Sequence, residues 1–225
     1  MTKLIIFDWD DVITLRSKEG YFKCYHEALD AVGIHLSPEE ELTRIIAKWG
    51  KHHREELKEL LKENLGLVNK ACEVYEQKFF GDTFINELKI LDGTQELLKR
   101  LSKKYILAIS TGQHPKMFPR IEKKFSIPGV FSQIIFAYDI CDPEKQKPNP
   151  YSLLKIMKNQ KAKPEETVFI GDARTDMIMA QNAGVTPIAV LTGQMSKSEA
   201  EKLGVKYIIK DVRDLEKVLE KIKLE

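Results

Sequence analysis

Short apolar runs recur along the chain and alternate with segments whose apolar residues repeat at helical spacing. The runs are rich in β-branched and aromatic residues and show little polar alternation, as strands buried on both faces do. Strands that alternate with helices favour a parallel sheet with right-handed crossovers. The sequence therefore predicts an α/β fold built on a doubly wound, Rossmann-like parallel sheet. The expected strands are 4–7, 106–110, 134–137, 168–170, 188–191 and 207–209, and helices are expected at 94–103 and 214–222.

One region breaks this alternation, because residues 18–88 contain no convincing strand. The stretch SPEE at 37–40 has the pattern of a capping box with proline at the first helical position. Leucine and isoleucine residues at helical spacing follow it, and helices are expected around 42–46, 53–64 and 71–80. We therefore expect an α/β core domain over 1–16 and 89–225, with an inserted all-helical domain over 17–88.

Charge and cysteine content exclude several classes of protein. The chain has 36 basic and 34 acidic residues without a long basic block, which argues against a nucleic-acid partner. Cys24, Cys72 and Cys141 lie far apart with no CxxC pair, which favours free thiols and argues against a zinc site. No stretch approaches the roughly 20 apolar residues of a membrane helix, and the first apolar run ends at Asp8, too early for a signal peptide. We expect a cytoplasmic protein that does not bind membranes, and either a monomer or a homodimer.

Carboxylates follow two of the expected strands. Asp8 and Asp10 come directly after the first strand, where residues i and i+2 point to the same side. Asp172 follows the strand at 168–170, and Asp176 lies four residues later on the same face of the next helix. Alone, each could be a solvated loop acid or a helix cap. Ligands of open α/β sheets bind at the carboxyl ends of strands, so we expect these four acids to meet there.

Four acids in one cavity need a counter-ion. Two like charges about 4 Å apart repel by roughly 4 kcal/mol at an effective dielectric constant near 20. A hard divalent cation with oxygen ligands removes that repulsion, and Mg²⁺ fits this ligand set. The sequence therefore predicts a magnesium site formed by Asp8, Asp10, Asp172 and Asp176.

Two further segments add groups that suit a phosphate. Ser110, Thr111 and Gly112 end the second expected strand, where a hydroxyl and free backbone N–H groups could hold phosphate oxygens. Lys147 stands just before a proline-stiffened turn. Alone it would be a solvated surface lysine, but beside the acids and a phosphate it becomes the compensating charge.

At these positions the chain resembles the haloacid dehalogenase superfamily, whose four motifs occur here in order. The stretch FDWDDV at 7–12 is similar to the DxDx(T/V) motif, and Thr111 matches the Ser/Thr of the second motif. Lys147 in KPNP matches the third motif, and GDARTD at 171–176 is similar to the GDxxxD of the fourth. The helical insertion resembles the C1-type cap of phosphoglycolate-phosphatase-like members of subfamily I.

The resemblance implies a mechanism. Asp8 would attack a phosphoryl group to form an aspartyl-phosphate, with Mg²⁺ and Lys147 screening the repulsion between anions. Asp10 would protonate the leaving oxygen and then activate a water molecule; true dehalogenases lack an acid at this position. The metal would be held by Asp8, the backbone carbonyl of Asp10, and Asp172, with Asp176 as an inner or outer ligand. The implied enzyme is a phosphoric monoester hydrolase for a small phosphorylated metabolite.

The chain departs from the family pattern at a few positions. Asp11 stands where the family usually has glycine, and we expect a solvated turn residue there. Leu15 and Arg16 occupy positions where many members have Asp-Ser or Asp-Thr. Trp9 is bulkier than the usual Leu or Phe, and a core role is expected for it. These changes bear on substrate choice more than on reaction type.

A basic turn lies in the helical insertion. The stretch WGKHHR at 49–54 places Lys51 and two histidines between Trp49 and Arg54, after Gly50 breaks the helical pattern. In similar C1-capped members this loop contacts substrate, so Arg54 is a candidate for binding an anionic substrate. An ordinary exposed turn between two helices explains the same residues. The adjacent histidines do not suit a metal site, because neighbouring positions do not face one pocket.

Two other functions remain open at this point. A phosphomutase of the β-phosphoglucomutase type is similar in the VIT that follows the acidic pair, but its helper histidine has no clear match near Gly20 and Tyr21. A receiver-like phospho-accepting signalling module is doubly wound too, with an acidic pair, a Thr/Ser and a Lys. Receiver domains, however, lack a long helical insertion and carry no GDxxxD motif.

Overall fold

The computed structural model describes residues 2–224, which divide into two compact units. The α/β unit runs to Leu15 and resumes at Lys89, and the helical unit is Arg16–Leu88. The chain leaves and re-enters the α/β unit through paired segments, because the backbone N–H of Leu15 donates to the Lys89 carbonyl at 2.8 Å and the reverse bond is 3.0 Å long. The sequence placed the start of the insertion one residue later, at position 17.

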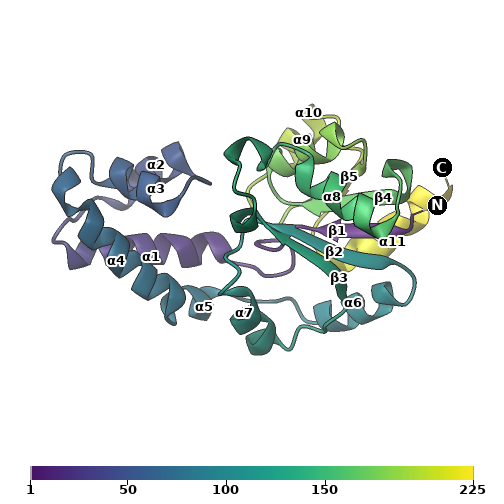
Figure 1. Ribbon diagram of the computed structural model, residues 1–225, viewed down its shortest axis with the longest axis horizontal. Coiled ribbons are helices and arrows are strands. Elements are labelled where there is room, and N and C mark those ends of the chain that lie inside the picture. The colour runs from purple at the N-terminus through teal and green to yellow at the C-terminus, as the bar shows by residue number, and fades with distance from the viewer. Residues whose placement is uncertain (1, 225) are drawn as a thin grey trace. The chain divides into compact units, whose positions relative to one another are not determined.

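Six strands form one parallel sheet in the order β3-β2-β1-β4-β5-β6 (Figure 1). Every neighbouring pair of strands is parallel. This confirms the predicted doubly wound α/β fold. The strands are β1 (Leu4–Phe7), β2 (Ile106–Thr111), β3 (Phe131–Phe136), β4 (Thr167–Gly171), β5 (Thr186–Val190) and β6 (Tyr207–Ile209).

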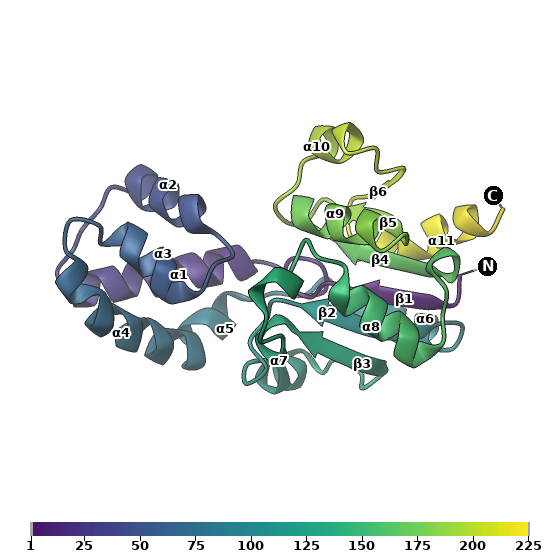
Figure 2. The same cartoon turned by 45° about the horizontal axis from the view of Figure 1, so that its top comes forward.

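Helices cover both faces of this sheet. On one face, α8 and α9 pack against alternate strand residues such as Leu4, Ile6 and Phe169, and α6 and α11 lie on the other face (Figure 2). Burial on both faces explains why the strand sequences are apolar without alternation. The helices of this unit are α6 (Thr94–Ser102), α7 (Phe118–Phe125), α8 (Tyr151–Gln160), α9 (Arg174–Asn182), α10 (Lys197–Lys202) and α11 (Leu215–Leu224). Short 3₁₀ turns are η2 (Ala137–Asp139), η3 (Pro143–Lys145), η4 (Pro164–Glu166) and η5 (Val212–Asp214).

The strand order reverses direction between β1 and β4. Phe7 lies opposite Ile170 in the register, and the backbone N–H of Asp8 donates to the Ile170 carbonyl at 2.8 Å. The residues that follow these two strands therefore start from neighbouring points at the same edge of the sheet. In doubly wound folds such a switch point is where ligands bind.

The helical unit contains only helices and turns within residues 16–88. Ser37 caps α2 by accepting the N–H of Glu40 at 3.2 Å, and Pro38 occupies the first helical position, as predicted. In the part of the chain that the structure describes, the return bond of a capping box is not among the contacts of Glu40, whose carboxylate accepts a hydrogen bond from Arg44. Aromatic rings fill its interior, and Tyr25 stacks on Tyr75 with ring centroids 4.5 Å apart. The helices are α1 (Ser17–Ala31), α2 (Pro38–Lys48), α3 (His53–Leu60), α4 (Val68–Phe80) and α5 (Thr83–Glu87), with the 3₁₀ turn η1 (Leu65–Leu67).

A buried acid joins α3 to the turn that precedes it. Glu56 is 5% exposed and accepts hydrogen bonds from the Tyr25 hydroxyl and from the backbone N–H of Gly50, the latter at 3.0 Å. Gly50 has a φ of +83°, a left-handed conformation that favours glycine. Burial raises the pKa of Glu56 to about 7, although these hydrogen bonds and one from the Lys51 backbone lower it.

Two further expectations can be compared with the structure. Cys24, Cys72 and Cys141 are all free thiols, as predicted. Within residues 2–224, no helix has both the length and the apolar character needed to cross a bilayer.

The substitution Glu56→Gln should flatten the pH dependence of the helical unit's stability. The folded-state pKa of Glu56 lies above its ordinary value, so its stabilising contribution is complete below pH 4.5 and is lost as pH rises to about 7, in total about 3 kcal/mol. Urea unfolding at pH 5 and pH 8 would measure this loss through the fluorescence of Trp49, which is the sole tryptophan left in a Trp9→Phe background.

Glu55→Gln is the matched control, because Glu55 is an exposed neighbour on α3 that pairs with Lys58 at 2.7 Å. The control should keep the wild-type difference between the two pH values. The same difference in Glu56→Gln would contradict the assignment.

Candidate active site

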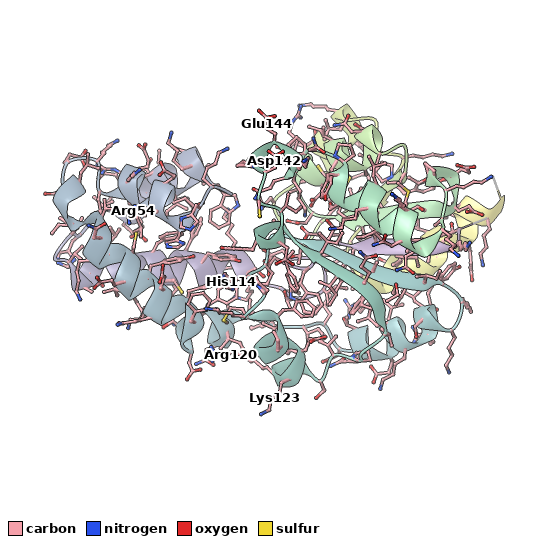
Figure 3. All side chains as sticks on the ribbon, in the orientation of Figure 1. Arg54, His114, Arg120, Lys123, Asp142 and Glu144 are labelled. Carbon is pink, nitrogen blue, oxygen red and sulfur yellow. The ribbon has the colours of Figure 1, made fainter. Side chains whose placement is uncertain are left out.

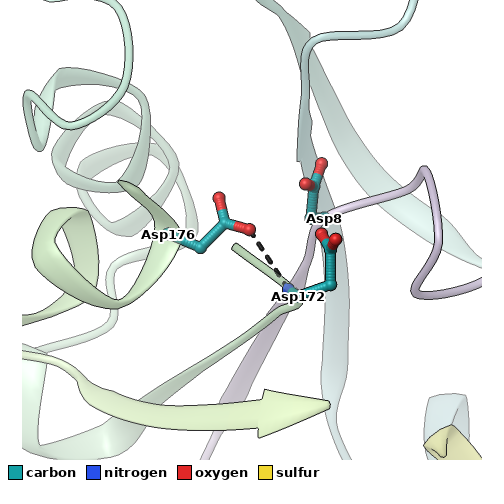
Figure 4. Close-up of side chains that lie close together, drawn as sticks. All are labelled: Asp8, Asp172 and Asp176. Carbon is teal, nitrogen blue, oxygen red and sulfur yellow. Dashed lines mark hydrogen bonds between the residues drawn. The ribbon is translucent and has the colours of Figure 1, made fainter. Parts of the chain in front are cut away.

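Three carboxylates converge at the switch point of the sheet. Asp8 follows β1, Asp172 follows β4, and Asp176 lies in the first turn of α9 (Figure 4). One carboxylate oxygen from each lies within 4.8 Å of the others, and all three residues are buried. We call these residues the acidic trio.

Backbone N–H groups fix the orientation of the trio. Asp8 Oδ1 accepts the N–H of Trp9 at 2.8 Å, and Asp172 Oδ2 accepts the N–H of Gln194 at 3.0 Å. Asp176 Oδ2 accepts the N–H groups of Asp172 and of the following alanine, each at 3.2 Å. Asp176 therefore caps the N-terminus of α9 with one carboxylate oxygen. Its other oxygen contacts Lys147.

Lys147 bridges two members of the trio. Its Nζ lies 2.8 Å from Asp8 Oδ2 and 2.8 Å from Asp176 Oδ1. Burial alone would lower the pKa of Lys147, but the charges of Asp176 and Asp8 outweigh it and raise the pKa above its ordinary value. Lys147 is thus a permanent cation inside the site, as the sequence predicts.

One ammonium group does not balance three carboxylates. Burial raises the pKa of Asp8 to about 6, where Lys147 lowers it and Asp176 raises it further. Burial raises the pKa of Asp172 well above its usual range, and the charges of Asp176 and Asp8 add to this effect. Burial is the largest cause of both pKa shifts, and repulsion between the neighbouring carboxylates adds to it; a bound cation would reduce that repulsion. The trio offers the oxygen ligands and the charge deficit that suit a hard divalent cation.

Asp10 belongs to the same edge of the sheet but not to the trio. Its carboxylate accepts two hydrogen bonds from the Gln113 side-chain amide, at 3.0 and 3.2 Å. The four acids were expected to meet at one site, but the Asp10 carboxylate lies outside the trio. The family resemblance implied that the backbone carbonyl of Asp10 binds the metal, and that assignment stays a prediction.

The end of β2 lies beside this pair. Thr111 is 2% exposed, and its Oγ1 accepts the N–H of Gln113 at 2.9 Å. Gly112 is exposed, and a Cβ there would meet nothing within 4 Å, so the backbone at this point is open to a ligand. Ser110 faces elsewhere, because successive strand residues point to opposite faces. Its hydroxyl donates to Ser152 Oγ of α8 at 2.7 Å, so we leave Ser110 out of the phosphate-binding set.

Asp11 and Trp9 can now be placed. Asp11 is 7% exposed, so the expectation of a solvated turn residue is wrong. It has a φ of 56°, a conformation that glycine adopts at less cost, and its carbonyl accepts the Thr192 hydroxyl at 2.5 Å. Trp9 is fully buried and packs against Phe118 with ring centroids 4.5 Å apart, which confirms a core role.

Sequence reasoning missed the loop that follows β5. Besides the N–H of Gln194, this loop supplies the N–H of Met195, which donates to the Asp172 backbone carbonyl at 2.8 Å. Gly193 lies so close that a Cβ there would be 1.9 Å from Asp172 Oδ2. Since β5 pairs with β4, the rule about strand ends that identified Asp172 would also have indicated this loop.

Arg54 lies on α3 in the helical unit (Figure 3). It is exposed, and its Nη2 donates to Asn69 Oδ1 of α4 at 2.5 Å. A role of Arg54 in substrate binding stays a prediction.

Comparison with known proteins connects this geometry to one family. A family model described as haloacid dehalogenase-like hydrolase matches residues 5–190. A putative pyrophosphatase PpaX of Caldanaerobacter subterraneus is 25% identical over 217 residues, 96% of this chain and 93% of that protein. A phosphoglycolate phosphatase of Mannheimia succiniciproducens is 23% identical over 63% of this chain and 62% of its own length. A solved structure of a predicted phosphoglycolate phosphatase from Haemophilus somnus has a TM-score of 0.80 at 20% identity, with 97% and 98% of the two chains covered.

The substitution Gly193→Ala should disturb the trio and leave the fold in place. The added methyl group would overlap the Asp172 carboxylate and force it out of position. We expect the dissociation constant for Mn²⁺, measured by titration calorimetry, to rise at least about tenfold, because one of few charged ligands moves.

Gly129→Ala is the matched control, since a Cβ there meets nothing within 4 Å and the backbone has no left-handed φ. It should bind Mn²⁺ as the wild type does. Equal affinity in both variants would show that Gly193 does not support the site.

Proposed function

The chain belongs to the haloacid dehalogenase-like hydrolase family, and from this premise we propose that it hydrolyses the phosphomonoester of a small metabolite. One observation carries the proposal: the Asp8 carboxylate lies 2.8 Å from the Lys147 ammonium group, within the acidic trio and beside Asp10. Family membership removes the basis for a receiver-like signalling module.

In the first step, an Asp8 carboxylate oxygen attacks phosphorus and the bond from phosphorus to the leaving oxygen breaks. The product is an aspartyl-phosphate, and the leaving oxygen takes a proton from the Asp10 carboxyl group. With a pKa of about 6, Asp8 is mostly ionised at neutral pH and is available as a nucleophile. The positive charge of Lys147 offsets the repulsion between the carboxylate and the anionic phosphate.

In the second step, the ionised Asp10 takes a proton from a water molecule as the water oxygen attacks phosphorus. The bond between phosphorus and Asp8 breaks, inorganic phosphate leaves, and Asp10 is protonated again for the next cycle. Such acid–base help contributes about 10²–10⁴-fold to rate. We propose that the Thr111 hydroxyl and the backbone at Gly112, where a Cβ would meet nothing within 4 Å, hold phosphate oxygens during both steps.

We propose Mg²⁺ as the cation, held by the carboxylates of the trio and by the backbone carbonyl of Asp10. When bound, it would neutralise charge on the phosphate and on the trio. The ligands are all oxygens, which fits Mg²⁺ better than a softer metal.

We propose that the helical unit is a cap that selects the substrate, with Arg54 as its candidate anion-binding residue. Two relatives are named for pyrophosphate and phosphoglycolate, which are both small anions. The phosphate ester of a small anionic metabolite in the cytoplasm is therefore the substrate class that we propose.

The substitution Asp8→Asn should abolish hydrolysis without unfolding the protein. Removal of the nucleophile lowers kcat by at least about 10⁴-fold, as for other covalent mechanisms. Phosphate release from p-nitrophenyl phosphate and from a panel of phosphorylated metabolites would measure this loss. Asp139→Asn, an exposed acid of the same unit, is the control and should stay active. Normal turnover by Asp8→Asn would refute the mechanism. If the wild-type protein instead isomerised a sugar phosphate without releasing phosphate, it would be a mutase.

Magnesium should stabilise the protein, and more so at pH 8 than at pH 5. At pH 5 protons compete for Asp8 and Asp172, whose pKa values are raised, so the cation must displace them. At 100 times its dissociation constant Mg²⁺ adds about 2.7 kcal/mol, or about 5–10 °C in Tm.

Differential scanning calorimetry with Mg²⁺ and with EDTA measures this shift. Asp172→Asn should raise the Tm in EDTA, because it removes a repelled charge, and should lose the response to Mg²⁺. A wild-type Tm that is equal in Mg²⁺ and EDTA would argue against a cation site.

A further inference from the structure

Gln113 is a fully buried polar residue for which the proposed mechanism has no role. It lies two residues after the end of β2 and is 0% exposed. Its side-chain Nε2 donates to both carboxylate oxygens of Asp10, at 3.0 and 3.2 Å. Its Oε1 accepts the backbone N–H of His114 at 2.8 Å, and its own backbone N–H donates to Thr111 Oγ1 at 2.9 Å.

These bonds connect the groups that would act on the two sides of the phosphate. Asp10 comes from the segment after β1, and Thr111 ends β2, the neighbouring strand. The amide nitrogen contacts both oxygens of the Asp10 carboxylate, and so it restricts the position of that carboxylate. The hydrogen bond from the His114 backbone N–H in turn restricts rotation of the Gln113 amide.

We propose that Gln113 is a positioning residue, which holds the Asp10 carboxyl group in the place needed for proton transfer to the leaving oxygen. The inference rests on the proposed phosphatase function and assigns a residue to one step of it. An amide is uncharged and does not titrate, so it can hold Asp10 without adding a competing proton donor of variable charge. The rate of a proton transfer depends strongly on the position of the acid, because misplacement of a reacting group by about 1 Å can lower the rate by about 10²-fold.

The leaving group gives a test that a general loss of structure would not imitate. An alkyl phosphate needs a proton on its leaving oxygen, whereas p-nitrophenolate leaves without one. We therefore expect Gln113→Met to lower kcat/KM for glycerol 2-phosphate by about 10–100-fold. For p-nitrophenyl phosphate we expect a loss below about threefold, because the step reported by kcat/KM does not need Asp10 there.

Two variants separate the two hydrogen-bonding ends of the amide. Gln113→Met loses both the donor to Asp10 and the acceptor for the His114 N–H group. Gln113→Glu keeps that acceptor but places a carboxylate against Asp10. If Gln113 acts through Asp10, both variants should show a lower kcat/KM for the alkyl ester glycerol 2-phosphate at pH 8. If it only supports the loop at His114, Gln113→Glu should be close to wild type, and the proposal is wrong.

Further controls isolate the pathway through Asp10. Gln113→Met should cost nothing more in an Asp10→Asn background, since two changes that act through one group are not additive. Gln95→Met removes a side-chain amide that donates to a backbone carbonyl at 2.9 Å elsewhere in the unit, and should leave both substrates unaffected. Equal losses for the two substrates in Gln113→Met would overturn the proposal.

A structural readout keeps this inference separate from the proposed function. In a crystal structure of Gln113→Met, the Asp10 carboxylate should rotate or occupy two orientations, while the Asp8 carboxylate keeps its contact with Lys147. This can be observed even if the wild-type protein hydrolyses no phosphomonoester, in which case only the proposed function fails. An unchanged Asp10 orientation would overturn the positioning role whatever the activity.

Discussion

The site depends on one ammonium group, that of Lys147, which lies between the carboxylates of Asp8, after β1, and Asp176, in α9. Parallel strands end at one edge of the sheet, and the order β3-β2-β1-β4-β5-β6 makes β1 and β4 neighbours at the switch point. Acids after both strands must therefore lie close together, and burial, with repulsion between them, raises the pKa values of Asp8 and Asp172. Lys147 offsets this repulsion by contacting two of the trio, and backbone N–H groups donate to one oxygen of each carboxylate. The arrangement stays short of positive charge, which is the physical reason to expect a cation.

Much of the fold could be predicted from the sequence, because burial on both faces leaves an unmistakable apolar run. The strands β1 and β6 were predicted at their observed bounds, and β2, β4 and β5 within two residues. The strand β3 was predicted at 134–137 but begins at Phe131. It pairs with one strand only, so polar Ser132 and Gln133 are tolerated, and a register shift lies opposite them in β2. Edge position and register are properties of the sheet that a local pattern does not contain.

The site residues also fall into those that could be predicted from the sequence and those that could not. Residues whose chemistry is unusual at a strand end, such as Asp8 and Asp172, could be predicted because a charge after a buried run requires a partner. Lys147 lies in a loop, and it could be predicted only because the acids need a compensating charge and because it matches the third family motif. Residues that act through geometry could not. Gly193 matters because a Cβ would overlap Asp172, and Gln113 because its amide reaches Asp10 across more than 100 positions of sequence. Ser110 shows the opposite error, since its hydroxyl suited a phosphate but the alternation of the strand turned it toward α8.

The residues with proposed chemical roles are not spread over both units. Every residue with a proposed role in bond making or breaking lies in the α/β unit, and those residues are the ones that match the family motifs. Other features act through local geometry. Asp11 takes a conformation that usually calls for glycine, and Gln113, which follows the neighbouring strand, donates to Asp10, the proposed acid–base residue. In the helical unit, the turn at 49–54 is fixed to its own helix by the buried Glu56. The proposed reaction chemistry is common to many phosphate esters, so the substrate selection that we propose for the helical unit would depend on features such as this turn, which carries exposed basic side chains.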